Sequence, residues 1–132
     1  MRIFIDTSAF YALLDRDDTN QEAAASAWTS MLSSDNTLMT SNYILVETCA
    51  LLQNRLGIAA TRAFQEELVP IVNIEYVNPE VHRSGMAALL AAARRNLSLV
   101  DCVSFEIMRI LGVKNAFTFD PHFKEQGFHT IP

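Results

Sequence analysis

The sequence predicts an α/β fold, a three-layer α/β/α sandwich with a mostly parallel five-stranded sheet. Short apolar runs alternate with longer segments of helical spacing, which favours parallel strands covered by helices on both faces. The 132 residues fit one domain with one core, and no repeat, low-complexity tract or Gly/Ser/Pro-rich linker divides them. We therefore expect a single domain over residues 1–132.

Five apolar runs are the expected strands. Each is brief and rich in β-branched or aromatic residues, as is typical of strands buried in a parallel sheet. The runs are RIFI at residues 2–5, TLMT at 37–40, IVNIEYV at 71–77, NAFTF at 115–119 and HTI at 129–131.

Local signals place helices between these runs. Thr19 and Glu22 have the spacing of a capping box, which predicts that a helix begins there. The segment 78–95 opens with Asn-Pro, a pair that is typical of a helix start. Gly57 and Gly112 stand where helix ends would favour a left-handed residue.

The charge balance argues against one class of function. Fifteen acidic residues against ten basic ones give a net charge of −5, unlike the basic surface of a protein that holds nucleic acid by phosphate contacts alone. This argument has less force against a metal-dependent nuclease. Two bound divalent cations would bring −5 to −1 and would lie where a phosphate must dock.

Cysteine usage and apolar run length exclude other classes. Cys49 and Cys102 lie in apolar helical stretches and form no CxxC or Cys/His grouping, so we expect core residues rather than zinc or redox ligands. The longest apolar runs are far shorter than the roughly 18 residues that cross a membrane. Asp6 ends the first run too early for a signal peptide. We expect no membrane contact and a cytoplasmic location.

Four carboxylates from separate segments are expected to meet at one edge of the sheet. Asp6 ends the first strand and Asp120 ends the fourth, and ligands in such folds bind at the carboxyl ends of the strands. Glu47 lies early in the helix after the second strand. Asp101 lies in the first turn of the helix at 98–112. The N-terminal turns of such helices return to the same edge.

Glu47 lies within the apolar stretch YILVETCALL, where a charge needs a partner. An unpaired carboxylate moved out of water costs several kcal/mol, and two carboxylates about 4 Å apart repel by about 4 kcal/mol at a protein surface. A hard divalent cation would offset both costs. The sequence has no convergent His/Cys set, which favours Mg²⁺ or Mn²⁺ over zinc. Two such ions can assist phosphodiester hydrolysis.

Each acid also has a purely structural interpretation. Asp6 and Asp120 can cap a turn or a helix, and Asp101 fits a capping box with Ser98. Glu47 can form an ion pair with an arginine. We favour a shared site because four separate structural roles would otherwise have to coincide at one edge of one sheet.

Polar residues near the acids are candidates for supporting roles. Thr7 and Ser8 follow the first acid, where they could hold a metal-bound water or a phosphate oxygen, or cap the helix that begins there. Ser104 lies on the same helix face as the aspartate three residues earlier and could orient it. His122 lies two residues past the fourth acid and could reach the site, although loop histidines are usually only solvated.

Four motifs occur in order along nearly the whole chain. They are DTS at residues 6–8, the Glu within YILVETCALL, the Asp of SLVDCVSF, and TFDPHF. No single motif is specific, but their combination resembles a PIN-domain ribonuclease, especially the VapC-type toxins of bacterial and archaeal toxin-antitoxin pairs.

This resemblance implies a sheet of order 3-2-1-4-5 and a Mg²⁺-dependent endoribonuclease that acts on RNA. It implies that Asp6, Glu47 and Asp101 are the catalytic, metal-binding acids, and that Asp120 is the fourth acidic position, the most variable one in the family. The resemblance further implies a cognate antitoxin as partner and a homodimer.

Other functions stay open at this point. The chain could be a non-catalytic interaction module of the same fold, or an RNA-processing nuclease without an antitoxin. Phosphoryl transfer through an aspartyl nucleophile at Asp6 is less favoured, because a second Asp two residues later and a well-placed Lys are missing.

Overall fold

The computed structural model describes residues 1–132 and contains one five-stranded sheet in the order β3-β2-β1-β4-β5. All neighbouring strands pair in parallel, so the predicted order is confirmed and the sheet is fully rather than mostly parallel. The strands are β1 (Arg2–Ile5), β2 (Thr37–Ser41), β3 (Asn73–Glu75), β4 (Asn115–Phe117) and β5 (His129–Ile131).

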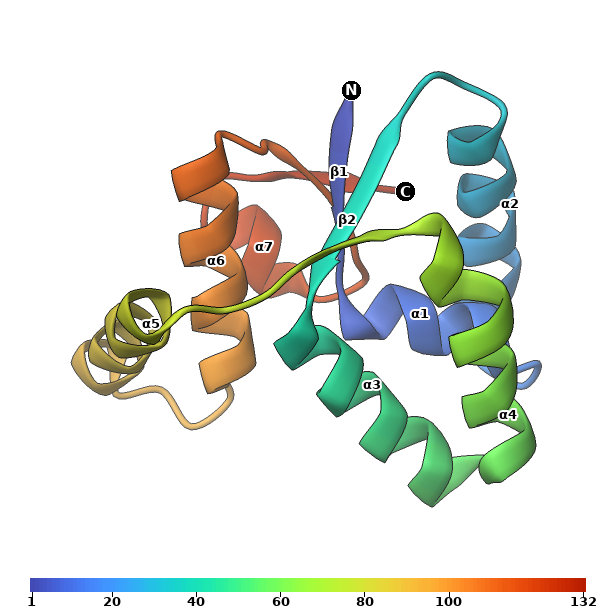
Figure 1. Cartoon of the computed structure of the whole chain (residues 1–132), viewed down its shortest axis with the longest axis horizontal. Coiled ribbons are helices and arrows are strands. Elements are labelled where there is room, and N and C mark those ends of the chain that lie inside the picture. Colours follow the sequence, from blue (N-terminus) through green and yellow to red (C-terminus); the bar gives the residue numbers. More distant parts are fainter.

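Helices cover both faces of this sheet. Figure 1 shows α5 and α6 on one side of β1 and β2, with α2 and α4 on the other. The helices are α1 (Thr7–Leu14), α2 (Gln21–Leu32), α3 (Asn42–Arg55), α4 (Ile58–Ala63), α5 (Pro79–Ala92), α6 (Leu99–Leu111) and α7 (Pro121–Glu125). A π turn at Phe64–Leu68 and a 3-10 turn at Val69–Ile71 continue α4. None of these helices has the length and apolar character that crossing a bilayer requires.

The core is built around β1, the central strand. Its residues Ile3, Phe4 and Ile5 are fully buried, and the aromatic rings of Phe117 and Phe123 are buried with them. Burying a side chain of this size contributes about 1.5–3 kcal/mol each. The residue that follows β1 is therefore held by the most firmly packed strand of the fold.

Several helix boundaries confirm the sequence signals. Asn78 caps α5 by accepting the Val81 N–H at 2.9 Å, although a left-handed Ala93 (φ 51°) ends this helix before residue 95. Gly57 and Gly112 have φ of 93° and 68°, as expected of residues at helix ends.

Other boundaries differ from the prediction. The capping box at Thr19 and Glu22 is wrong: α2 begins at Gln21, and its N-cap Asn20 makes no side-chain cap bond. The carboxylate of Asp18 accepts the Asn20 N–H at 2.8 Å, so an aspartate turn precedes the helix instead.

Two strands are also shorter than the runs at 71–77 and 115–119. The 3-10 turn occupies the start of the first run, which delays β3 to Asn73. The strand β4 stops at Phe117, and the chain then leads to Asp120 at the start of α7.

Candidate metal centre

Asp6 lies between β1 and α1, where the sheet order places it beside β4. Its N–H donates to the Phe117 carbonyl at 3.0 Å. Its Oδ2 accepts from the Ser8 hydroxyl at 2.7 Å, the Ser8 N–H at 3.3 Å and the Thr118 hydroxyl at 3.0 Å. No hydrogen bond reaches Oδ1. One oxygen therefore fixes the carboxylate, and the other is left to bind a ligand.

Thr118 is a site residue that sequence reasoning missed. Its hydroxyl donates to Asp6 and accepts the Asp120 N–H at 2.9 Å, so it joins the ends of β1 and β4. The Ser8 hydroxyl supports the same link because it accepts the Phe119 N–H at 2.9 Å. The sequence analysis placed Thr118 inside the expected strand at residues 115–119, so no sequence signal marked it as a site residue.

Asp101 combines the structural role with a place at the acidic edge. The capping box with Ser98 is confirmed: Asp101 Oδ2 accepts the Ser98 N–H at 3.1 Å, and Ser98 Oγ accepts the Asp101 N–H at 3.0 Å. Asp101 Oδ1 accepts no hydrogen bond. The Ser104 hydroxyl donates to the Val100 carbonyl at 2.7 Å and makes no hydrogen bond to Asp101.

Asp120 and His122 lie at the start of α7. Asp120 is the N-cap residue, and its Oδ1 accepts the His122 backbone N–H at 2.9 Å, which leaves Oδ2 without a partner. His122 was expected in a loop, whereas Pro121 at the first helical position starts a short helix that buries the imidazole.

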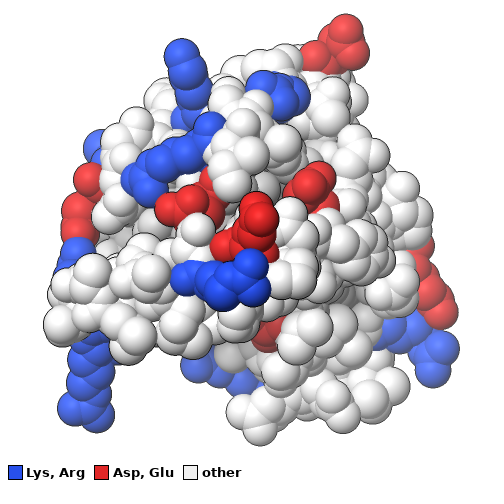
Figure 2. Space-filling model, turned by 60° about the vertical axis from the view of Figure 1, so that its left-hand side comes forward, with Lys and Arg blue, Asp and Glu red and all other residues white.

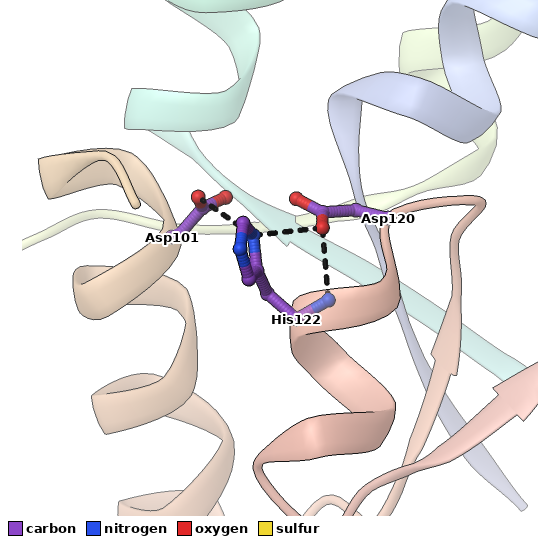
Figure 3. Close-up of side chains that lie close together, drawn as sticks. All are labelled: Asp101, Asp120 and His122. Atoms are coloured by element: carbon purple, nitrogen blue, oxygen red, sulfur yellow. Dashed lines mark hydrogen bonds and ion pairs between the residues drawn. The ribbon is translucent and has the colours of Figure 1, made fainter. Parts of the chain in front are cut away.

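The imidazole of His122 lies between two carboxylates (Figure 3). Its Nδ1 is 2.9 Å from Asp120 Oδ1 and 3.8 Å from Asp101 Oδ2. Although the first distance is short, the ring N–H direction does not fit a hydrogen bond, and Nδ1 is a buried nitrogen without a hydrogen-bond partner. Asp101, Asp120 and His122 together offer ligand atoms that lie within 4.8 Å of one another.

Glu47 and Asp6 stand outside this set of three but face the same charges. Glu47 is half-buried on α3, and its carboxylate makes no hydrogen bond of the usual geometry. Thr7 lies nearby, and its hydroxyl oxygen accepts from Thr48 at 3.1 Å.

Burial and mutual repulsion disturb the carboxylates of this edge. Burial raises the pKa of Asp6 to about 7; hydrogen bonding from Ser8 opposes the rise, and the charges of Asp101 and Asp120 add to it. Burial is also the main cause of the raised pKa of Asp101 and of Glu47, and the negative charge of Asp120 adds to both. A bound cation would favour the ionised forms, so the residues fit a metal ion chemically.

The surface around the acids is mixed in charge. Figure 2 shows acidic side chains grouped near the middle of one face, with Lys and Arg side chains around them. A shallow depression of about 400 Å³ adjoins Glu47 and is lined by Asn42, Tyr43, Val46 and Val100. A second one, of about 220 Å³, contains Thr118, Asp120 and Lys124 among its lining residues.

Comparisons with known proteins identify the family of the chain. The family model described as PIN domain matches residues 3–129. The chain is 36% identical over 127 residues to the 23S rRNA-specific endonuclease VapC20 of Mycobacterium tuberculosis, a match that covers 96% of this chain and 95% of that protein.

Solved structures give the same result. The crystal structure of Mycobacterium tuberculosis VapC20, a Sarcin-Ricin loop cleaving toxin, has a TM-score of 0.85 at 35% identity and covers 96% of this chain and 95% of that one. VapBC2 from Rickettsia felis, bound to a promoter DNA fragment, has a TM-score of 0.72 at 10% identity, covering 98% and 97%. FitAcB from Neisseria gonorrhoeae has a TM-score of 0.69 at 12% identity, and the match covers 98% of this chain and 96% of that one. The last two matches show the fold alone.

The sheet order, the acids at its carboxyl edge and the match over residues 3–129 lead to one conclusion. The chain belongs to the PIN domain family, in which its similarity is to VapC proteins.

Proposed function

We propose that this protein is a metal-dependent endoribonuclease that hydrolyses RNA phosphodiester bonds, and that it acts as the toxin of a toxin-antitoxin pair. One observation carries the proposal. Asp6, Asp101 and Asp120 each have one carboxylate oxygen held by hydrogen bonds and one without a partner. They lie at the starts of α1, α6 and α7. Such an arrangement orients several carboxylates in advance toward a shared ligand.

The four acids Asp6, Glu47, Asp101 and Asp120 would hold Mg²⁺ or Mn²⁺, ions that prefer oxygen ligands. When bound, such an ion supplies an activated water for attack on the phosphodiester and stabilises the leaving oxygen. Ser8 and Thr118 orient Asp6 through its Oδ2, and Ser98 orients Asp101. Thr7 contributes by its position beside Glu47, where its hydroxyl opposes the rise in the Glu47 pKa.

Lys124 is the phosphate contact that we propose among the basic residues. Arg94 is already engaged in an ion pair with Glu125, and Arg109 lies over the Phe105 ring and donates to Gln126. Lys124 is exposed and shares a depression with Asp120. We expect Lys124→Ala to raise KM severalfold with little change in kcat, and Lys114→Ala, another exposed lysine, to change neither. Equal KM values for the two variants would contradict the contact.

Ribosomal RNA is the substrate class that the similarity to VapC20 supports. We propose that the chain cleaves 23S rRNA. A hairpin that copies the Sarcin-Ricin loop is then expected to be cut faster than a hairpin of scrambled sequence. Equal cutting of both hairpins would leave an RNA nuclease with another target.

The proposed partner is a cognate antitoxin, and the proposed assembly is a homodimer. The similarity of the fold to VapBC2 and FitAcB supports a search for the antitoxin. Co-expression with the reading frame next to the gene should abolish RNA cleavage by the purified complex. Light scattering would give the mass of the isolated protein and test the dimer.

Substitution of Asp101 tests the catalytic proposal. Asp101→Asn keeps a side-chain oxygen for the Ser98 N–H, so the helix cap persists while the charge is lost. We expect RNA cleavage in Mg²⁺ or Mn²⁺ to fall by about 10²-fold or more, and EDTA to abolish it in the unaltered protein. The control Asp17→Asn removes an exposed acid that is not one of the four proposed ligands and should retain full activity.

Two outcomes would contradict the proposal. Cleavage that persists in Asp101→Asn or in EDTA would refute the metal mechanism. An unaltered protein that cuts no RNA in Mn²⁺, and whose tight binding to a partner survives Asp101→Asn, would instead be a non-catalytic interaction module.

A further inference from the structure

We infer that His122 is a nitrogen ligand of the divalent ion, and that it binds the ion through Nδ1 together with Asp101 and Asp120. This inference deepens the proposed function and rests on the metal site described there. It changes the ligand set from oxygen alone to mixed nitrogen and oxygen.

The first support is the unpartnered nitrogen. The His122 side chain is 10% exposed, and Nδ1 is sealed from solvent without a hydrogen-bond partner. A buried polar atom left in this state costs about 1–3 kcal/mol unless something else satisfies it. Nδ1 points between two carboxylates (Figure 3), so a cation is the group that would satisfy all three at once.

The distances agree with a shared ion. Octahedral Mg²⁺ or a similar ion with bonds of about 2.1 Å holds neighbouring ligand atoms about 3 Å apart and opposite ones about 4 Å apart. Nδ1 lies 2.9 Å from Asp120 Oδ1 and 3.8 Å from Asp101 Oδ2. Both separations fall within the range that a single coordination sphere allows. Each of these two carboxylate oxygens also accepts a backbone N–H, so it would bind the ion through its second lone pair. Without an ion, the 2.9 Å contact between His122 Nδ1 and Asp120 Oδ1 is unfavourable. If Nδ1 carries a proton, its N–H is misaligned; if it does not, two lone pairs face each other.

The position of His122 is fixed by the helix that carries it. Its backbone N–H donates to Asp120 Oδ1, and the next residue, Phe123, is fully buried with its ring edge-on to Phe105 of α6. The ring centroids of this pair are 5.0 Å apart. Because α7 is anchored to α6 in this way, the imidazole stays between Asp120 of its own turn and Asp101 of α6.

A nitrogen donor changes which metal is preferred. Imidazole is a better ligand for transition metals than for Mg²⁺, which strongly favours oxygen. We therefore expect the unaltered protein to bind Mn²⁺ more tightly than Mg²⁺, and the difference to depend on His122. Without His122 the remaining carboxylates would discriminate less between the two ions.

Electron spin echo measurements on the Mn²⁺-loaded protein test the ligand directly. The chain has three histidines, so labelling histidine with ¹⁵N identifies the donor class without any substitution. We expect a ¹⁴N coupling to Mn²⁺ that becomes a ¹⁵N coupling in the labelled protein. Bound Mn²⁺ with no nitrogen coupling would overturn the inference and leave the carboxylate site intact. Failure to bind Mn²⁺ at all would overturn the metal site and this inference together.

Two variants assign the coupling to one residue. His122→Asn should remove the nitrogen coupling and weaken Mn²⁺ binding, measured by calorimetry, by about tenfold or more, with a smaller loss for Mg²⁺. His129→Asn alters an exposed histidine on β5 and should change neither affinity. Equal losses for Mn²⁺ and Mg²⁺ in a folded His122→Asn protein would overturn the inference, because a purely structural role would affect both ions alike. If that variant does not fold, the coupling in the labelled unaltered protein still tests whether a histidine nitrogen binds Mn²⁺.

Discussion

Helix α6 contributes to two regions with opposite physical character, one of clustered charges and one of close apolar packing. In its first turn, Asp101 faces other carboxylates, and burial raises its pKa. Two residues further on, Val103 is fully buried against α5 at Gly85, where an added Cβ would lie 2.5 Å from Val103 Cγ2. The first region gathers charges that repel, and the second packs two helices as closely as glycine permits.

The contrast shows where this fold gains stability and where it loses it. Close packing of α5 on α6 adds dispersion and hydrophobic stabilisation in the absence of any ligand. The acidic edge is stabilised only when something positive binds there. Removing a carboxylate charge from the acidic region should therefore raise the stability of the metal-free protein, whereas a substitution in the packed region should lower it.

The largest expected effect is at Asp6. Its pKa is about 7 in the folded protein against an ordinary value of 3.8, so the folded state binds a proton that the unfolded state releases. This stabilisation is complete below about pH 4 and is lost as the pH rises through 7, by up to about 4 kcal/mol. Asp6→Asn should remove this contribution, leave only the pH dependence that comes from the raised pKa of Asp101 and of Glu47, and make the metal-free protein more stable than the unaltered one at pH 8. Urea unfolding in EDTA across this range measures the difference.

One result of the same experiment would contradict this prediction. If the unaltered protein and Asp6→Asn lose stability in parallel from pH 5 to pH 8, Asp6 is ionised normally and the charge at this edge is already balanced. Adding Mn²⁺ at pH 8 should stabilise the unaltered protein more than the variant, because the variant lacks one of the carboxylates.

A smaller effect of opposite sign is expected at Gly85. Gly85→Ala forces the new methyl group into Val103, an overpacking cost of about 1–3 kcal/mol that the better helix propensity of Ala offsets by up to about 1 kcal/mol. Thermal and urea unfolding should show a net loss. Val103→Ala in the same chain should remove much of the clash, so a double-mutant cycle with additive losses would argue against this contact.

Thr118→Val should affect both stability and RNA cleavage. The substitution keeps the shape but removes the hydroxyl that donates to Asp6 and accepts from Asp120. We expect a loss of about 1 kcal/mol in stability, and a fall in RNA cleavage that exceeds what the stability change explains, because both acids lose their orientation. Thr118→Ser should restore most of the activity. Cleavage rates that follow stability alone would reduce Thr118 to a packing residue.

The smallest effect is expected outside both regions. Arg94 and Glu125 form an exposed ion pair that joins the turn after α5 to α7. Surface pairs of this kind contribute little because solvent and salt screen them. Glu125→Gln should leave the unfolding midpoint unchanged within error. A measurable loss that disappears in high salt would show that the position of α7, and so of His122, depends on this pair.

The sequence predicted the elements whose signals are local. The bounds of β1 and β5 are confirmed to the residue, and Asn78 and Gly112 mark helix boundaries as expected. The capping box uses one oxygen of Asp101 and leaves the other without a partner, so the structural role and the proposed catalytic role are compatible.

What the sequence could not show depends on contacts between distant segments. Thr118 acquires its role only because β4 pairs with β1, which brings its hydroxyl to Asp6. His122 looked like a solvated loop residue because the five-residue helix α7 is too short to give a periodic pattern, and its burial depends on packing against α6. The Thr19 capping box failed because α2 has Asn20 as its N-cap and follows an aspartate turn in which Asp18 accepts the Asn20 N–H.

The hydrogen bond between Asp6 and Thr118 spans 112 positions of the polypeptide. During translation, a nascent chain that has emerged only as far as α6 holds Asp6, Glu47 and Asp101. It still lacks Asp120 and Thr118, the second of the two hydroxyl residues that fix Asp6. The proposed site would therefore be incomplete until the chain beyond β4 has been synthesised and β4 has paired with β1.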